Sequence, residues 1–518
     1  MFITELSKRK VLCLIFVVFL LYMLINGKCR LIIKDNTVIK VQDGIFQKRK
    51  NITSIEIPSG VTRIGSMAFM GCDELKELKI PDSVLCIGSL AFWRCTNLQS
   101  IEIPDLVAEI GPRAFSGCEK LVRIKLPEDL PEIEEALFSN CNSLKNVEIP
   151  KNIKKIGDEA FLNCANLEYI CIPDGVTEIG EKAFAGCTSL SQIDTPDQIE
   201  RVGAGAFDGT SCLINKKADR YGNIYIGGIL ISNKGDRSYV KVRPGTRVIA
   251  PEAFLGDQVL QTVEVPEGLR CIEDSAFEKC INLENINMPD SLKVIGGSAF
   301  DSCKIQNMVL PDHLVEIGPG AFFSCRDMKY IQIPKSVIKI GQNPFMGTPW
   351  FDSLECDEYG CKYGGGILLS YEGACSYLKI QEGTRVIPYF VPYFLSDNKK
   401  LLEYIDIPDS VTHIGNNAFW GCINLKKIKM SKGVISIGGS AFESCLSLEQ
   451  IELPEGLKYI GSMAFSRCES LTEVILPTSV IEIGGGVFMH CKKLKTIKVP
   501  KNLRHIDIYK EKAKIIYY

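Results

Sequence analysis

Cysteine is the residue type most able to do chemistry in this chain of 518 residues, which contains 22 of them. Thiolates are nucleophiles, metal ligands and disulfide partners. Most of these cysteines, however, follow a phenylalanine by three residues, and no CxxC pair occurs anywhere. The placement indicates a structural register rather than a metal site. The members of this cysteine ladder are Cys72, Cys95, Cys118, Cys141, Cys164, Cys187, Cys280, Cys303, Cys325, Cys422, Cys445, Cys468 and Cys491.

We expect the ladder cysteines to be buried free thiols that pack as small hydrophobic groups. Equivalent positions on stacked strands lie roughly 4.7–4.9 Å apart with parallel Cβ vectors. A disulfide needs Cβ atoms about 3.8 Å apart that face each other. Metal binding and disulfides are the less favoured alternatives. Cys356, Cys361 and Cys375 lie close together in the chain, and a local disulfide or metal site is open there.

No other pattern indicates a catalytic centre. The motifs HExxH and GxSxG and the EF-hand loop are absent, and no phosphate-binding pattern follows Gly364–Gly366. Net charge is −2, which disfavours nucleic acid as a partner because such binding needs a basic stripe. We therefore expect no enzyme activity, no cofactor and no metal. His413 is expected to be solvated, and the histidines are scattered without shared spacing: His313, His413, His490 and His505.

A 23-residue unit positions all of these residues. A fixed period between 20 and 50 residues is the signature of a solenoid, in which each coil packs on its neighbours. Residues 75–97 show the unit clearly, and a phenylalanine marks its phase along the chain. The marker residues are Phe46, Phe69, Phe92, Phe115, Phe138, Phe161, Phe184, Phe207, Phe254, Phe277, Phe300, Phe322, Phe345, Phe394, Phe419, Phe442, Phe465 and Phe488.

Each unit predicts one short strand and one apolar turn. Charged and apolar residues alternate over 77–80, which indicates a strand with one buried face. Pro81 lacks a backbone donor and should end the strand. Gly88 is expected to permit a turn. Ala91 and Phe92 then place a small and a large apolar group in the core, which we interpret as a short helical turn.

Two segments interrupt the period, and each is interpreted as a β-hairpin that replaces one coil. Both have a glycine-rich apolar stretch and a Ser-Tyr pair, and both continue into Gly-Thr-Arg-Val-Ile. The predicted divisions are 1–27 (signal peptide or signal anchor), 28–50 (N-terminal cap), 51–207 (first repeat block), 208–241 (hairpin insert), 242–345 (second block), 346–379 (hairpin insert), 380–500 (third block) and 501–518 (C-terminal cap).

The N-terminal segment predicts export. Lys8, Arg9 and Lys10 precede an apolar run from Val11 to Ile25, which fits a secretory signal. The run is shorter than the roughly 20 residues that span a bilayer comfortably. Cleavage and retention as a signal anchor are both open. We expect a secreted or cell-surface protein that touches a membrane only through this segment, if the segment is uncleaved.

Two outward rows are candidates for contact with a partner. The middle residues of the I-x-I tripeptide in the first five coils alternate in sign, and we interpret them as a solvated charge ladder rather than a docking surface: Glu56, Lys79, Glu102, Lys125 and Glu148. Tyrosines recur at the outward position that opens the strand, and tyrosine is enriched at binding hot spots. The candidate partner-binding residues are Tyr169, Tyr239, Tyr330, Tyr377 and Tyr404, with Tyr389 and Tyr393 near the last two. Alternatively, tyrosine simply suits an exposed strand.

The unit L-x-x-I-x-I-P-x-x-V-x-x-I-G-x-x-A-F-x-x-C resembles the BspA-like class of leucine-rich repeats over about residues 38–507. This resemblance implies an α/β repeat solenoid that is right-handed, with a parallel β-sheet on one face. It also implies a secreted or surface protein of a microbe that mediates protein–protein contact or cell adhesion. We expect a non-enzymatic monomer with a protein or glycan partner on host matrix or other cells. The alternatives are a structural scaffold without a specific ligand and, more remotely, an enzyme built on the inserts.

Overall fold

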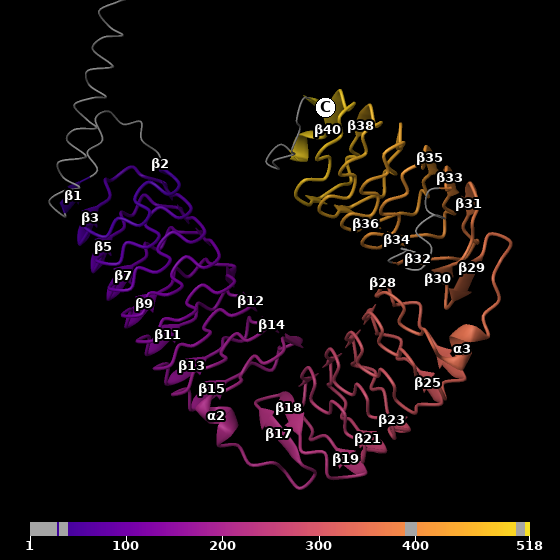
Figure 1. Ribbon diagram of the computed structural model, residues 1–518, viewed down its shortest axis with the longest axis horizontal. Coiled ribbons are helices and arrows are strands. Elements are labelled where there is room, and N and C mark those ends of the chain that lie inside the picture. Colours follow the sequence, from indigo (N-terminus) through magenta and orange to yellow (C-terminus); the bar gives the residue numbers. More distant parts are fainter. Residues whose placement is uncertain (1–27, 31–39, 389–400, 504–512) are drawn as a thin grey trace, which may run out of the picture. The chain divides into compact units, whose positions relative to one another are not determined.

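The computed structural model describes residues 28–30, 40–388, 401–503 and 513–518 (Figure 1). The predicted signal segment and Tyr389 and Tyr393 lie outside the described residues. The chain forms two compact units. The first consists of the described residues up to Lys234 together with Val242–Ala253. The second consists of Gly235–Lys241 and the described residues from Phe254 to Tyr518.

In the first unit, three-residue strands of successive coils pair in parallel, as the alternation in the sequence predicted. Four of them, Glu77–Lys79, Ser100–Glu102, Arg123–Lys125 and Asn146–Glu148, bury the central residue and expose the residues beside it. From Ser54 onward paired residues are 23 apart, so Leu78 lies beside Ile101. The strands are β1 (Lys28–Arg30), β3 (Ser54–Glu56), β5 (Glu77–Lys79), β7 (Ser100–Glu102), β9 (Arg123–Lys125) and β11 (Asn146–Glu148), followed by the pair β13 (Tyr169–Cys171) and β15 (Gln192–Asp194).

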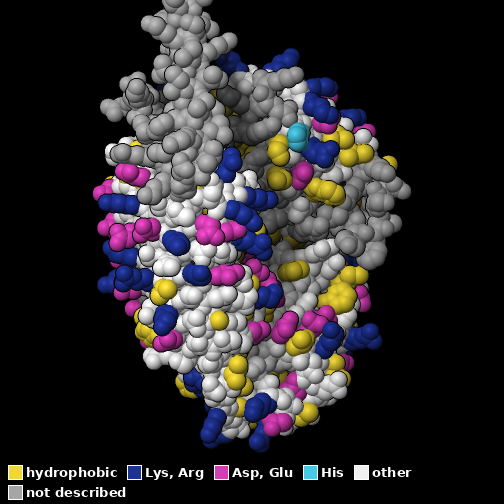
Figure 2. Space-filling view, turned by 60° about the vertical axis from the view of Figure 1, so that its left-hand side comes forward, with side chains coloured by type: hydrophobic (Ala, Val, Ile, Leu, Met, Phe, Trp, Pro, Cys, Tyr) yellow, Lys and Arg dark blue, Asp and Glu magenta, His cyan; other side chains and the backbone are white. Residues whose placement is uncertain are grey.

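This register confirms that the outward residues Glu56, Lys79, Glu102, Lys125 and Glu148 are neighbours of alternating sign. Figure 2 shows side chains of both signs interspersed over the visible surface. Opposite charges on adjacent strands attract, and each exposed pair contributes at most about 1 kcal/mol. The charge ladder therefore favours the native register.

Each coil also contains a second, two-residue strand, which the sequence pattern did not reveal. These strands form further parallel sheets, and most end on a buried residue that precedes the repeat glycine. The apolar side chains of the coil pack between the two sheets. The strands are β2 (Lys40–Val41), β4 (Arg63–Ile64), β6 (Cys86–Ile87) and β8 (Glu109–Ile110), then β10 (Glu132–Ile133), β12 (Lys155–Ile156), β14 (Glu178–Ile179) and β16 (Arg201–Val202).

The Ala-Phe segment is not the helical turn that we predicted. In an α-helix each backbone N–H bonds the carbonyl four residues earlier. Here Phe92 donates its N–H to the Ala114 carbonyl of the next coil at 2.8 Å, whereas Trp93 donates to the Leu90 carbonyl three residues earlier. Leu90 and Arg94 have φ of 59° and 56°, in the left-handed region. The segment is a series of turns that adds a third hydrogen-bonded ladder between coils.

The repeat glycine is required for a different reason from the predicted turn. Gly88 has no positive φ, but a Cβ at this position would lie 2.5 Å from the backbone N of Ser66 in the preceding coil. A distance that short is repulsive, so glycine at this position lets the two backbones approach closely. The same contact recurs at Gly318, where a Cβ would lie 2.3 Å from the Gly297 backbone N.

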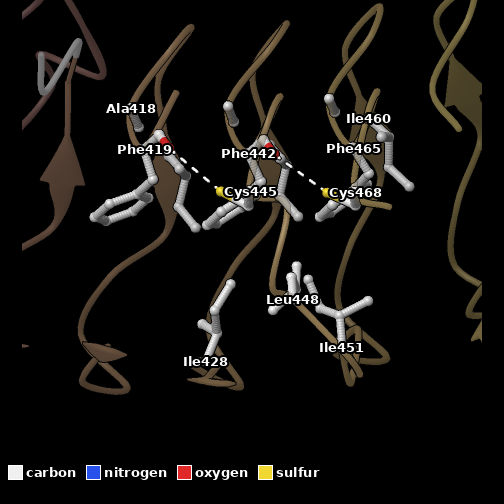
Figure 3. Close-up of a cluster of buried hydrophobic side chains, with 14 of the residues drawn as sticks. Ala418, Phe419, Ile428, Phe442, Cys445, Leu448, Ile451, Ile460, Phe465 and Cys468 are labelled. Carbon is white, nitrogen blue, oxygen red and sulfur yellow. Dashed lines mark hydrogen bonds between the residues drawn. The ribbon is translucent and has the colours of Figure 1, made fainter. Parts of the chain in front are cut away.

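The phenylalanines form a stacked column in each unit. Adjacent rings lie 4.7 to 5.9 Å apart between centroids and are close to parallel. Figure 3 shows part of this column, with Phe419, Phe442 and Phe465 one coil apart. Offset parallel rings at this distance attract beyond their burial. The phase marker of the sequence is therefore the centre of the core.

Both interruptions are antiparallel hairpins, as predicted. In the first, β17 (Asn223–Ile226) pairs with β18 (Ile229–Asn233), and β18 pairs in parallel with β20 (Val248–Ile249). The hairpin thereby continues the sheet of two-residue strands. The second insert repeats this arrangement with β29 (Cys361–Gly364), β30 (Ile367–Tyr371) and β32 (Val386–Ile387). A four-residue helix precedes each hairpin, α2 (Ser211–Ile214) and α3 (Pro349–Asp352).

The second unit repeats the two-strand coil. Its C-terminal strand, β41 (Lys514–Tyr517), pairs with β40 and follows the short helix η2 (Lys501–Leu503). The rows equivalent to the three-residue strands are β19 (Tyr239–Lys241), β21 (Thr262–Glu264) and the two-residue β23 (Asn285–Ile286); β25 (Asn307–Val309) and β27 (Tyr330–Gln332); β31 (Tyr377–Lys379), β33 (Tyr404–Asp406) and β35 (Lys427–Lys429); and β38 (Glu473–Ile475) and the four-residue β40 (Thr496–Val499). The two-residue rows are β22 (Cys271–Ile272), β24 (Val294–Ile295), β26 (Glu316–Ile317) and β28 (Lys339–Ile340); and β34 (His413–Ile414), β36 (Ser436–Ile437), β37 (Tyr459–Ile460) and β39 (Glu482–Ile483).

Candidate partner-binding surface

The predicted tyrosines open three-residue strands and point outward. Tyr169, Tyr239, Tyr330 and Tyr377 are between 39% and 49% exposed, and Tyr404 is half-buried. They begin β13, β19, β27, β31 and β33, so the strand alternation places them on the solvent side. Exposure alone does not distinguish a binding residue from an ordinary strand residue.

The hydroxyl groups of three of these tyrosines are engaged within the protein. Tyr169 donates to Asp194 Oδ2 at 2.9 Å, and Tyr239 donates to a carboxylate oxygen of Glu264 in the next coil. The hydroxyl of Tyr330 lies 3.3 Å from Oε1 of Gln332 in the same strand. The hydrogen bond to the Asp194 carboxylate raises the pKa of Tyr169 to about 12. Tyr169 and Tyr239 are therefore parts of cross-strand contacts, and Tyr330 is part of a contact within its own strand.

Tyr377 and Tyr404 are arranged differently. They are register partners on β31 and β33, and their rings stack at 5.1 Å with an interplanar angle of 15°. The edge of Tyr359 contacts Tyr377 at 6.0 Å between ring centroids. Asp406 occupies the position that Asp194 occupies beside Tyr169, but it pairs instead with Lys429 at 3.0 Å. Within the described chain, the hydroxyls of Tyr377 and Tyr404 have no hydrogen-bond partner.

Two lysines flank this aromatic cluster. Lys379 is the outward residue at the other end of β31, and Lys427 is the register neighbour of Tyr404 on β35. Neither forms an ion pair within the described residues, whereas the adjacent Lys426 pairs with Glu403 at 2.9 Å. We call the set formed by Tyr359, Tyr377, Tyr404, Lys379 and Lys427 the tyrosine–lysine patch. At its surface lie two ammonium groups and the hydroxyls of Tyr377 and Tyr404, which are unpartnered within the described chain.

The cysteine ladder lies in the core. Twelve of the ladder thiols donate a hydrogen bond from Sγ to the carbonyl oxygen of the phenylalanine in the preceding coil, at 3.0 to 3.4 Å. The contacts of Cys445 and Cys468 are drawn in Figure 3. Burial raises the pKa of the Cys118 thiol to about 12, and it raises the pKa of Cys141 well above its ordinary value. The neutral thiol is therefore the form that the core favours.

We expect the ladder thiols to resist alkylation in the native protein. Thiolate is the reactive form, so thiols whose pKa is raised by burial should react at least about a hundredfold more slowly than exposed ones. The exposed Cys171 and Cys356 are internal controls. At a pH of about 9, Cys118 and Cys141 should still resist labelling, because burial raises the pKa of their thiols. Mass spectrometry after timed iodoacetamide treatment measures this, and labelling of the ladder as fast as Cys171 would contradict burial.

The three cysteines of the second insert do not form a disulfide. Cys361 is buried, Cys356 is exposed, and the half-buried Cys375 has its Sγ 3.2 Å from the Tyr371 hydroxyl oxygen. No group of three or more His, Cys, Asp or Glu side chains is arranged as metal ligands among the residues that the structure covers. Asp357 accepts hydrogen bonds from two backbone N–H groups of the insert, including that of Cys361 at 2.8 Å.

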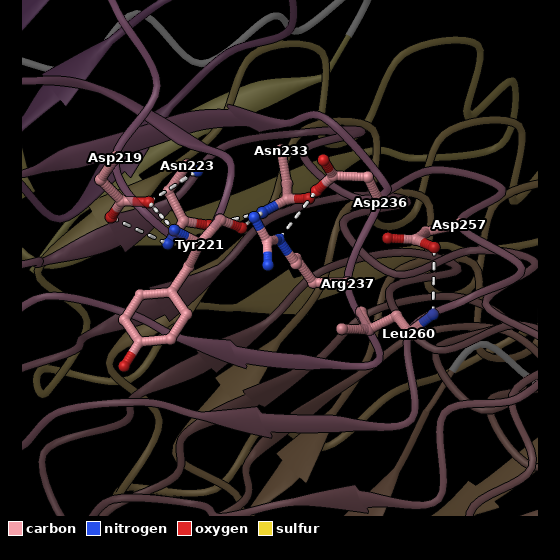
Figure 4. A network of polar contacts seen from close by, with 8 residues as sticks. All are labelled: Asp219, Tyr221, Asn223, Asn233, Asp236, Arg237, Asp257 and Leu260. Atoms are coloured by element: carbon pink, nitrogen blue, oxygen red, sulfur yellow. Dashed lines mark hydrogen bonds and ion pairs between the residues drawn. The ribbon is translucent and has the colours of Figure 1, made fainter.

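The first insert contains a polar network that the sequence did not single out (Figure 4). Asp219 Oδ1 accepts the backbone N–H groups of Tyr221 and Asn223 at 2.8 and 3.0 Å. Asn233 donates from Nδ2 to Asn223 Oδ1 at 2.7 Å. Carboxylate and amide groups satisfy one another here, so the network fixes the turn and the hairpin. The sequence signal that could have predicted this turn is Asp219, a residue type that forms Asx-type turns, two positions before Tyr221-Gly222.

His413 is not solvated as we expected. Its ring is half-buried, and Nδ1 lies 2.9 Å from the hydroxyl oxygen of Thr412. Burial, together with the charge of Arg385, lowers the pKa of His413. The side chain belongs to β34, and its hydrogen bond to the Thr412 hydroxyl is local.

The geometry defines a class of protein: a leucine-rich-repeat solenoid with parallel strands, two hairpin inserts and a variable outer surface. Within the described residues, no helix is long and apolar enough to cross a membrane. The BspA type leucine-rich repeat region matches residues 39–168, 108–218, 247–358 and 393–510. The chain therefore belongs to the BspA-type leucine-rich repeat family.

Solved structures of several bacterial proteins are similar to the chain. A leucine-rich repeat protein from Bacteroides ovatus is 26% identical, with 90% of this chain and 92% of that chain covered and a TM-score of 0.25. A leucine-rich cell surface protein from Faecalibacterium prausnitzii is 26% identical, covering 78% of this chain and 87% of that one with a TM-score of 0.33. Because these TM-scores are low, the family assignment rests on the repeat itself. No curated protein matches the chain significantly.

Proposed function

We propose that this protein is an exported, non-enzymatic adhesion protein that binds a partner protein through the tyrosine–lysine patch. The observation that carries the proposal is the exposed stack of Tyr377 and Tyr404, whose hydroxyls lack partners within the described chain while those of Tyr169 and Tyr239 are engaged. Tyrosine contributes large contact area at small entropic cost, so an unengaged pair is a candidate hot spot.

The ring arrangement favours a protein partner over a glycan at this patch. A sugar packs against the open face of an aromatic ring. Here one face of Tyr377 and one face of Tyr404 are turned toward each other, and Tyr359 and Tyr377 are in edge-to-face contact. Ring edges and hydroxyls remain for hydrogen bonding, and Lys379 and Lys427 favour acidic side chains on the partner. Added salt should therefore weaken the interaction.

The N-terminal sequence supports the proposed location. A basic start followed by the apolar run from Val11 to Ile25 is typical of a segment that directs export. A cleaved signal would leave a secreted protein, and an uncleaved one would anchor the solenoid at the cell surface. Mass spectrometry of the mature N-terminus distinguishes these two outcomes.

We expect replacement of both stacked tyrosines to weaken adhesion at least about tenfold, since each is expected to act as a hot spot. The measurement is binding of the full chain to immobilised extracellular-matrix proteins and to whole neighbouring cells, before and after Tyr377→Ala/Tyr404→Ala. The matched control is Tyr169→Ala/Tyr239→Ala, which removes two tyrosines from equivalent strand positions. The control should bind within about twofold of the unaltered chain.

Two outcomes would contradict this proposal. Equal losses for both double variants would mean that the patch has no special role. Absence of binding by the unaltered chain to every matrix protein and cell type would favour the alternative of a structural scaffold without a specific ligand.

A further inference from the structure

A groove on the turn side of the second unit is distinct from the tyrosine–lysine patch. It is a hollow with a volume of about 660 Å³. This volume lies within the range of about 300–1,000 Å³ that is usual for small-ligand sites. Gly297, Ser298 and Gly320 line it, and so do Phe323 and Met346.

The groove exists because the chain carries small residues at one repeat position. Ser298 and Gly320 occupy the left-handed turn position, with φ of 50° and 61°. In the early coils the same position carries Met67 and Leu90, with φ of 56° and 59°. The backbone conformation is therefore shared, and only the side-chain volume differs. Large side chains at 298 and 320 would fill the hollow.

Several polar groups in the groove have unused hydrogen-bonding capacity. Oδ1 of Asp301 accepts from the Ser302 hydroxyl at 2.7 Å, which leaves Oδ2 available. The side-chain amides of Gln342 and Asn343 and the hydroxyl of Ser298 have no partner among the described residues, and all three line the groove. Together they provide amide donors, amide acceptors, a hydroxyl and a carboxylate oxygen.

Apolar surface lies beside these polar groups. Phe323 and Met346 occupy successive coils at the position after the core phenylalanine, and their side chains are 37% and 36% exposed. A sugar ring has this mixture of properties: its C–H faces are apolar, and its hydroxyls both donate and accept hydrogen bonds. We propose that the groove binds a neutral saccharide, which places a ring face on Phe323 and hydroxyls on Asp301, Gln342 and Asn343.

The charges in the groove argue for a neutral ligand. The carboxylates of Asp274 and Asp301 line the groove without a lysine or arginine among the lining residues, so a sialylated or sulfated sugar would be repelled. The Asp274 carboxylate is partly engaged within the protein, because its Oδ1 accepts the Gly297 backbone N–H at 2.6 Å. The unpartnered amides offer a cation only weak acceptors.

The test uses the full chain on an array of neutral, sialylated and sulfated oligosaccharides, followed by calorimetric titration with the neutral oligosaccharide of strongest signal. Gly320→Met should fill the groove with a side chain that Met67 already presents at this turn position. Phe323→Ala should remove the stacking surface. Each is expected to weaken binding at least about tenfold. Leu255→Ala, at the repeat position of Phe323 but outside the groove, should remain within about twofold.

Several results would overturn the saccharide proposal. These are a lack of binding to any neutral oligosaccharide, preferential binding of sialylated or sulfated ones, and unchanged affinity in Phe323→Ala. Retained binding by Gly320→Met with an unaltered melting temperature would also refute it. The outcome is independent of the tyrosine–lysine patch, because Tyr377→Ala/Tyr404→Ala should leave saccharide binding unchanged.

Discussion

Replacing Phe442 with alanine is expected to lower the free energy of unfolding of its part of the solenoid by about 3–5 kcal/mol. The ring is completely buried and stacks between Phe419 and Phe465 at 5.3 and 5.4 Å between centroids. Its removal loses the transfer free energy and two stacking contacts, and the flanking rings are held by their own coils. The cavity can therefore collapse only partly.

Hydrogen exchange resolved along the chain is the suitable measurement, because a long repeat array need not unfold as one two-state unit. Protection should fall most in the coils that flank residue 442. Leu446→Ala is the control: Leu446 lies in the same coil but is 36% exposed, so its loss should cost no more than about 1 kcal/mol. Equal loss of protection in the two variants would show that the ring column does not organise the core.

Gly484→Ala is expected to destabilise the third repeat block by about 2–3 kcal/mol or more. An added Cβ would lie 2.2 Å from the backbone N of Ser462 and 2.6 Å from its Cα. Backbone cannot move aside as a flexible side chain can, so the two coils must separate. Separation would also weaken the Gly484 N–H to Ile460 carbonyl hydrogen bond, which is 2.8 Å long.

The adjacent residue supplies the control. An added Cβ at Gly485 meets nothing within 4 Å, and its φ lies outside the left-handed region. Gly485→Ala should therefore change stability by less than about 1 kcal/mol, and in the stabilising direction if the unfolded chain loses entropy. Urea denaturation of the two variants side by side tests the difference. Similar midpoints would mean that the close approach of coils at Gly484 is not what requires glycine.

The period and the parity of the strands could be read directly from the residues. Leu78 and Ile80 alternate with charged neighbours, and the structure buries both, with Glu77 and Lys79 outside. The hairpin inserts were also predictable, because Gly227-Gly228 and Gly364–Gly366 lie between apolar stretches. These features are local, so a window of a few residues contains the whole signal.

The second strand and the turn ladder could not be read in this way. Cys86–Ile87 is too short to show alternation, and it is a strand only because neighbouring coils pair with it. Leu90 and Arg94 hold positive φ, which residues other than glycine rarely adopt. Their conformation is stabilised by hydrogen bonds to the next coil, and a single unit carries no sign of those bonds.

The candidate sites likewise combine features that the local sequence predicts with features that depend on neighbouring coils. Strand parity predicted that the tyrosines point outward, and it did so equally for Tyr169 and Tyr377. Only the stacked coils decide that Asp194 accepts the Tyr169 hydroxyl, whereas Asp406 is taken by Lys429 and leaves Tyr377 without a partner in the described chain. The groove beside Phe323 likewise depends on four coils at once.

The sequence by itself determined the repeat, the outward and inward faces of its strands and the place of both hairpins, because apolar periodicity and turn residues act over short distances along the chain. The tertiary structure decided which polar groups remain available to a ligand. Hydrogen bonds and surface hollows form between coils, from residues 20 or more positions apart, and no short stretch of sequence specifies them.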